Sequence, residues 1–94
     1  LLLSQQDCVL CDQAKQLLSR LQAQYALEVE SVDFHSARGF ELAKSGGILF
    51  PPGIFLDGQP FSYGRASEGK LRREIETRLS RTATDLDGPQ SQDA

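Results

Sequence analysis

Cysteine is scarce in this sequence, and long apolar runs are missing from it. Only two of the 94 residues are cysteines, which is too few for the network of several disulfides that stabilises many small secreted folds. A membrane-spanning helix needs about 20 consecutive apolar residues, whereas the apolar stretch 48–56 is interrupted by Pro51, Pro52 and Gly53. We therefore expect one small soluble domain that an ordinary apolar core holds together.

Clustered positive charge is missing as well. The net charge is −3 and the basic residues are dispersed along the chain, which argues against binding to nucleic acid or to an anionic membrane surface. The segment 1–3 is apolar, but it is too short for the core of a signal peptide and has no basic leader. These features predict a cytoplasmic monomer whose partners are small molecules or other proteins.

Apolar spacing in the first part of the chain predicts a strand, a helix and a second strand. Leu1 to Ser4 is typical of a short buried strand. A helical stripe follows, with apolar residues three or four positions apart: Leu10, Ala14, Leu17, Leu18 and Leu21. Asp7 is the expected N-cap, so this helix begins at the cysteines. Leu27 and Val29 then alternate with glutamates, which predicts an edge strand that becomes irregular at Ser31.

The middle of the chain predicts a short helix and a hairpin. The helix is expected over residues 36–45, with Phe40, Leu42 and Ala43 turned inward and Gly46-Gly47 ending it. Asp57-Gly58 separates two apolar runs, which is typical of a hairpin turn. Because Pro60 cannot donate a backbone hydrogen bond, either the second strand of this hairpin lies at a sheet edge or Pro60 lies at the start of that strand.

The last apolar pattern predicts a helix that begins near the N-cap Ser67. Apolar residues recur every four positions, at Leu71, Ile75 and Leu79. From about Thr82 the sequence is polar and aperiodic, so we expect a domain over residues 1–81 and a disordered tail over 82–94. The order β-α-β-α-β-β-α implies an α/β fold with a mixed four-stranded sheet flanked by helices.

The two cysteines, Cys8 and Cys11, stand three positions apart at the start of the first helix. Residues at this spacing share a helix face with Cβ atoms about 5–6 Å apart, and a disulfide needs roughly 3.8 Å, so a small adjustment closes the bond. A helix N-terminus also favours the thiolate form. A redox-active pair is therefore favoured over a purely structural bridge. A zinc site is disfavoured because only His35 and carboxylates remain as further ligands.

The motifs together resemble the glutaredoxin branch of the thioredoxin superfamily over residues 1–81. In that branch a Cys-x-x-Cys pair opens the first helix, and a segment of the type Val-Pro-x-Val-Phe-Ile-Asn/Asp-Gly leads into the hairpin turn. This sequence has Cys8-Val9-Leu10-Cys11, then Pro51-Pro52-Gly53-Ile54-Phe55-Leu56-Asp57-Gly58, and finally Gly64-Arg65. It is most similar to a bacterial glutaredoxin-like group with a Cys-x-Leu-Cys motif and a last turn that reads Gly-Arg.

This resemblance implies a thioredoxin-like fold and a thiol–disulfide oxidoreductase without a bound cofactor or metal. Cys8 would attack a substrate disulfide, and Cys11 would resolve the mixed disulfide. Pro52 would be a cis-proline. The implied substrate-binding residues are Pro51, Pro52, Gly64 and Arg65. Implied partners are protein or glutathione disulfides and a thiol reductant, which is glutathione or a thioredoxin-type system; glutathione would then be a co-substrate.

Three features depart from the glutaredoxin pattern. Gln5 stands where glutaredoxins usually have a basic residue, and Asp7 is adjacent to Cys8, so the helix N-terminus is left as the main stabiliser of a thiolate. Pro51 has no N–H, so it offers a substrate backbone only its carbonyl. The turn 63–67 also differs from the usual glutathione-contacting turn, although Arg65 can pair with a carboxylate.

A second interpretation stays open, namely a redox-silent or redox-sensing binding module that kept the fold without turnover. Gln5 and Pro51 favour it. An iron–sulfur cluster shared through Cys8 and glutathione ranks last because the glutathione turn is altered. His35 is interpreted as an ordinary loop histidine, and the basic residues within 70–81 as a solvated helix face.

Overall fold

The computed structural model describes residues 1–86, with side chains through Ser80. Its elements are β1 (Leu2–Ser4), α1 (Val9–Gln22), β2 (Ser31–Asp33), α2 (Ala37–Gly46), β3 (Gly53–Leu56), β4 (Gln59–Tyr63) and α3 (Glu68–Leu86). The expected order of strands and helices is confirmed. No helix in this described part is both long and apolar enough to span a membrane.

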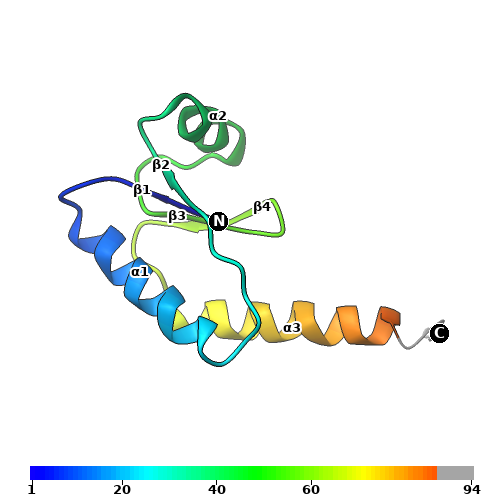
Figure 1. Ribbon diagram of the computed structural model, residues 1–94. Helices are drawn as coiled ribbons and strands as arrows, with labels where there is room; N and C mark the ends of the chain where they lie inside the picture. Colours follow the sequence, from blue (N-terminus) through cyan, green and yellow to red (C-terminus); the bar gives the residue numbers. More distant parts are fainter. Residues whose placement is uncertain (87–94) are drawn as a thin grey trace.

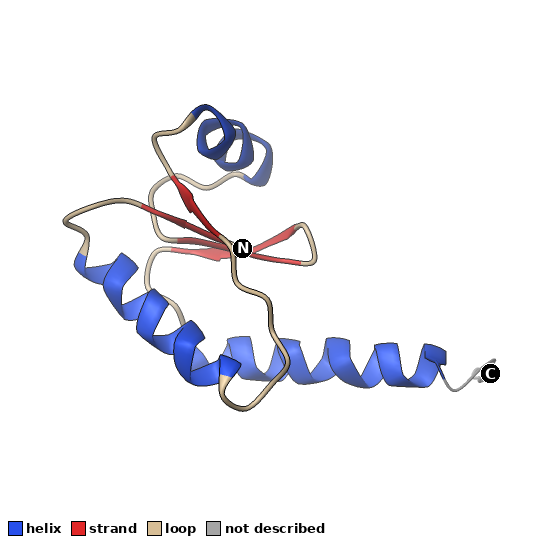
Figure 2. Ribbon diagram, viewed as in Figure 1, coloured by secondary structure: helices blue, strands red, loops and turns tan. Residues whose placement is uncertain are grey.

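The strands form one mixed sheet in the order β2-β1-β3-β4. β1 is parallel to β2 and antiparallel to β3, and β3 is antiparallel to β4. Helices α1 and α3 cover one face of the sheet and α2 covers the other (Figure 1, Figure 2). The protein therefore has the α/β, thioredoxin-like fold that the sequence predicts.

The core is divided between the two faces of the sheet. In a strand, successive side chains point to opposite faces. Leu2 accordingly packs with residues of α1 and α3, while Leu3 packs with Ala43 of α2 and Phe55 of β3. Both leucines are completely buried. The short central strand β1 thus joins the two halves of the core and carries the chain directly into the cysteine segment.

The second strand is shorter than its sequence pattern indicates. Only Ser31–Asp33 pairs with β1, and the expected strand around Leu27 and Val29 is wrong. Both side chains are partly buried against the core formed by α1 and α3, but they belong to a loop. The alternation of apolar and acidic residues therefore indicates only that every second residue contacts the core. An irregular loop can satisfy this pattern as well as a strand can.

Helix α2 has the expected position, and Leu42 and Ala43 pack on the core as expected, but Phe40 does not. Ser36 is its N-cap and Gly47, with φ 69°, is its C-cap. Phe40 is 60% exposed rather than turned inward. A Cβ atom at Gly39 would overlap the carbonyl oxygen of Asp33, so the helix approaches the end of β2 through this glycine. Gly39 and Ala43 form the inner face, and Phe40 is consequently placed on the outside.

The hairpin and the last helix follow their local signals. Asp57 and Gly58 both have positive φ, at 52° and 79°. Of the two positions that Pro60 allows, the structure has the edge strand, since β4 is the last strand in the sheet order. Ser67 caps α3, because its Oγ accepts the N–H of Lys70 at 3.3 Å. The helix continues to Leu86, past the expected domain boundary at residue 81, because neither glycine nor proline occurs between Gly69 and Gly88. Residues 87–94 of the expected tail lie outside the described residues.

Candidate functional site

Four chain segments meet at one end of the sheet. The register pairs Ser4 with Asp33 and Leu3 with Gly53, and it pairs Gly53 in turn with Tyr63. The segments that leave β1, β2 and β4, and the one that enters β3, therefore emerge side by side. This arrangement brings the sequence-predicted site residues to the same end of the molecule: Cys8, Cys11, Pro51, Pro52, Gly64 and Arg65.

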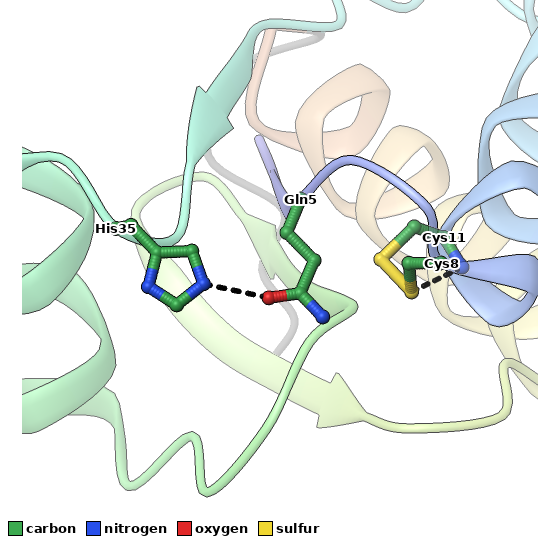
Figure 3. The surroundings of a disulfide bond; sticks show 4 residues. All are labelled: Gln5, Cys8, Cys11 and His35. Atoms are coloured by element: carbon green, nitrogen blue, oxygen red, sulfur yellow. Dashed lines mark hydrogen bonds between the residues drawn. A yellow bond between two sulfur atoms is a disulfide. The ribbon is translucent and has the colours of Figure 1, made fainter.

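Cys8 and Cys11 form a disulfide at the start of α1, with their Cα atoms 5.2 Å apart (Figure 3). Cys8 itself is the N-cap, with extended φ and ψ, and its Sγ accepts the backbone N–H of Cys11 at 3.1 Å. The expected N-cap, Asp7, has φ 54° and lies one position before the cap, where it turns the chain. The sulfur of Cys8 thus occupies the capping position that a side-chain oxygen usually takes.

The two sulfurs differ in their accessibility. Cys11 is completely buried, whereas Cys8 is partly exposed. The next residue, Val9, is 71% exposed. A molecule that approaches the helix N-terminus can therefore reach Cys8 without contacting Cys11.

The loop before β3 contains a cis peptide bond between Pro51 and Pro52. Pro52 is buried, and its carbonyl accepts the backbone N–H of Gly64 at 2.8 Å. The ring of Phe50 lies over Gly64 and meets the ring of Tyr63 edge-on, with ring centroids 5.1 Å apart. The proline loop and the turn that carries Arg65 are thereby joined into one surface.

His35 also lies at this end of the sheet and contacts Gln5, which the sequence did not indicate. It follows β2 and donates from Nε2 to Oε1 of Gln5 at 2.7 Å, since an amide oxygen can only accept (Figure 3). Gln5 follows β1, the parallel neighbour of β2. The parallel pairing of β1 and β2 is the signal that places these residues together. Both side chains lie near the disulfide, as Figure 3 shows.

Charged side chains are instead concentrated on α3. Glu68 accepts from Arg20 of α1 at 3.1 Å and from Arg72 at 2.9 Å. Arg72, followed by Arg20, holds the pKa of Glu68 below its usual value through these hydrogen bonds. A hydrogen bond to Glu76 raises the pKa of Tyr25. These contacts fix α3 to α1 and to the loop that follows it. Within residues 1–80 no group of three or more histidine, cysteine or carboxylate side chains is arranged to hold a metal ion.

Comparison with known proteins identifies the family. Residues 1–76 match the family model described as glutaredoxin-like domain (DUF836). Searches of curated proteins and of solved structures gave no significant match. The matched segment includes the cysteine pair, the cis-proline loop and the Gly64-Arg65 turn, and it covers most of the chain. The chain therefore belongs to the family of glutaredoxin-like domains, as its motifs predict.

Proposed function

We propose that the protein is a thiol–disulfide oxidoreductase that cycles Cys8 and Cys11 between a dithiol and a disulfide. The asymmetry of the pair is the observation that carries this proposal. Cys11 is completely buried while Cys8 is partly exposed, and the Cys11 N–H donates to the Cys8 sulfur. In the reduced protein the same N–H, together with the helix N-terminus, would stabilise negative charge on Cys8.

The proposed reaction has two exchange steps. The Cys8 thiolate attacks one sulfur of a substrate disulfide; a Cys8–substrate disulfide forms, and the other substrate sulfur leaves as a thiolate that takes a proton from water. The Cys11 thiol then attacks the Cys8 sulfur, and its proton passes to the substrate sulfur that leaves. The Cys8–Cys11 disulfide forms and the second substrate thiol is released, so the substrate gains two electrons and the cysteine pair loses two.

The proposed substrate surface lies beside Cys8 on the proline loop. Pro51 and Pro52 would contact the substrate backbone, with the Pro51 carbonyl as acceptor, because proline has no N–H to donate. The adjoining turn would contribute Gly64 and the exposed guanidinium of Arg65, which suits a carboxylate. Protein disulfides and glutathione disulfides are both proposed substrates of this surface.

A thiol reductant must return the oxidised pair to the dithiol form. We assign this role to glutathione, acting as a co-substrate, or to a thioredoxin-type system; two reductant thiols become one disulfide in the process. A reducing compartment supplies such thiols, so we place the protein in the cytoplasm as a monomer that contributes to cell redox homeostasis.

A redox-silent or redox-sensing binding module is the second candidate. It is favoured by Pro51, which removes one backbone donor from the proposed substrate surface, and by the neutral Gln5 beside the disulfide. Equilibration in graded glutathione buffers, followed by trapping of free thiols, separates the two candidates. A cycling enzyme has a midpoint between those of thioredoxins and glutaredoxins, roughly −270 to −200 mV, whereas a silent module keeps one state throughout.

The direct test compares two single substitutions in a dithiol-coupled disulfide reductase assay. Cys8→Ser removes the attacking sulfur and is expected to lower the rate at least about 100-fold. Cys11→Ser is the matched control, because it keeps Cys8 and should accumulate a Cys8–substrate mixed disulfide that mass spectrometry detects. Full reductase activity in Cys8→Ser, or no mixed disulfide in Cys11→Ser, would contradict the proposed roles.

A further inference from the structure

A concave surface lies between β4 and α3. It has a volume of about 580 Å³ and includes three basic side chains, Arg65, Lys70 and Arg73. Ser62, Ser67 and Thr77 also line it, together with Phe61. We call this surface the basic groove. Its size lies within the range of about 300–1,000 Å³ that is usual for ligand sites.

The three cations of the basic groove differ from the other arginines of this region. Arg20 and Arg72 bind Glu68, and Arg78 binds Glu74 and Asp57. By contrast, Arg65, Lys70 and Arg73 have no ion pair or side-chain hydrogen bond among residues 1–80, whose side chains the structure describes. The carboxylates that could neutralise the groove are already used by the cations outside it.

The one acidic residue that lines the groove, Glu74, is itself engaged. Its Oε2 accepts from Nε of Arg78 at 2.8 Å, so its charge is partly compensated. The basic groove therefore presents uncompensated positive charge, although the whole chain has a net charge of −3. Such a local field attracts an anionic ligand and repels cationic ones.

We propose that the basic groove binds an acidic peptide segment of a protein partner. Carboxylates pair with arginine and lysine, while the hydroxyl groups and Phe61 can contact peptide amides and carbon atoms. β4 is an edge strand in the sheet order, so an extended segment can lie along it (Figure 1). A nucleic acid is disfavoured because the net negative charge of the protein opposes a continuous row of phosphates.

The basic groove is connected to the disulfide end of the molecule through the Gly64-Arg65 turn. The N–H of Gly64 donates to Pro52 at 2.8 Å, and the next residue, Arg65, lines the groove. A bound acidic segment would therefore lie next to the proline loop. Binding does not require thiol exchange, so this proposal can hold even if the proposed enzyme activity fails, and the reverse is also true.

Fluorescence anisotropy with a rhodamine-labelled hexaglutamate peptide tests the proposal on the complete chain. The double variant Lys70→Gln/Arg73→Gln is expected to raise the Kd at least tenfold. The control Lys15→Gln/Lys44→Gln removes the same charge from two exposed helix positions that have no ion-pair partner among the described side chains, and it should change the Kd by less than twofold. Circular dichroism verifies that both variants fold.

Three results would overturn the proposal. The first is failure of hexaglutamate to bind the unsubstituted protein, or equal binding of a hexaglutamine peptide. The second is an equal loss of affinity in the two double variants, since net charge alone would then explain binding. The third is tighter binding of an oligothymidylate than of hexaglutamate, which would assign the basic groove to nucleic acid. Amide chemical-shift changes confined to β4 and α3 would support the assigned location.

Discussion

The disulfide end and the basic groove adjoin one another, yet they are built from different kinds of charge. At the disulfide, the Cys8 sulfur accepts a backbone N–H, the hydrogen-bonded side chains of Gln5 and His35 lie nearby, and the single carboxylate of Asp7 is adjacent in sequence. In the basic groove, Arg65, Lys70 and Arg73 carry full charges that no described side chain neutralises. The proposed thiol exchange at the first site would therefore depend on the backbone, and the proposed peptide binding at the second would depend on side chains.

Because of this difference, the two regions should respond differently to surface substitutions and to salt. The dipoles at a helix N-terminus act over the first turn and persist when surface side chains are replaced. Exposed charges are screened by salt and can be removed singly without loss of the fold. The cysteine site should therefore tolerate surface substitution, whereas the groove should lose affinity with each cation.

The largest expected effect comes from Gly64→Ala, at the junction of the two regions. Gly64 has φ 78°, and a Cβ there would lie 3.0 Å from Cε1 of Phe50. We expect the free energy of unfolding in urea to fall by about 1–2 kcal/mol, because left-handed backbone is costly for alanine. Both the hexaglutamate affinity and the thiol alkylation rate should change.

Gly69→Ala is the matched control for this substitution. Gly69 is in α3, its φ is not positive, and a Cβ there meets no other atom within 4 Å, so stability should stay equal or rise slightly. Equal destabilisation by the two substitutions would contradict the strain at Gly64. A change at only one of the two regions would show that the turn does not couple them.

Added salt should weaken ligand binding at the basic groove but leave the cysteine site almost unchanged, and we expect this effect to be smaller than that of Gly64→Ala. Raising NaCl from roughly 0.05 to 0.5 M shortens the Debye length well below 10 Å, so the Kd for hexaglutamate should rise about tenfold. The equilibrium constant for reduction of the Cys8–Cys11 disulfide by dithiothreitol, a neutral reagent, should change less than about twofold. Parallel responses in both measurements would mean that surface charge also controls the cysteine site.

The order of elements could be predicted because each one has a local signal. Ser67 caps a helix, Asp57-Gly58 forms a hairpin turn and Gly47 ends a helix through its own backbone preference. The close approach of the two cysteines could also be predicted from the sequence, since a spacing of three positions on a helix nearly provides the geometry that a disulfide needs.

The remaining features depend on contacts between distant segments. Val29 belongs to an alternating pattern that is typical of a strand, but it packs against the core from a loop. Phe40 lies outside because Gly39 contacts the end of β2. The contact between His35 and Gln5 follows from the parallel register of β1 and β2, which no local pattern specifies.

The smallest expected effect belongs to His35→Ala, which removes the hydrogen bond to Gln5 at 2.7 Å. Both partners are exposed enough for water to replace the bond, so the free energy of unfolding should change by less than about 0.5 kcal/mol. If the backbone governs Cys8, the rate of iodoacetamide alkylation of the reduced protein should change less than about threefold. Lys44→Ala, an exposed position on α2, is the control for a nonspecific surface effect. A tenfold or larger change in His35→Ala alone would mean that the His35–Gln5 pair, rather than the helix N-terminus, sets the reactivity of Cys8.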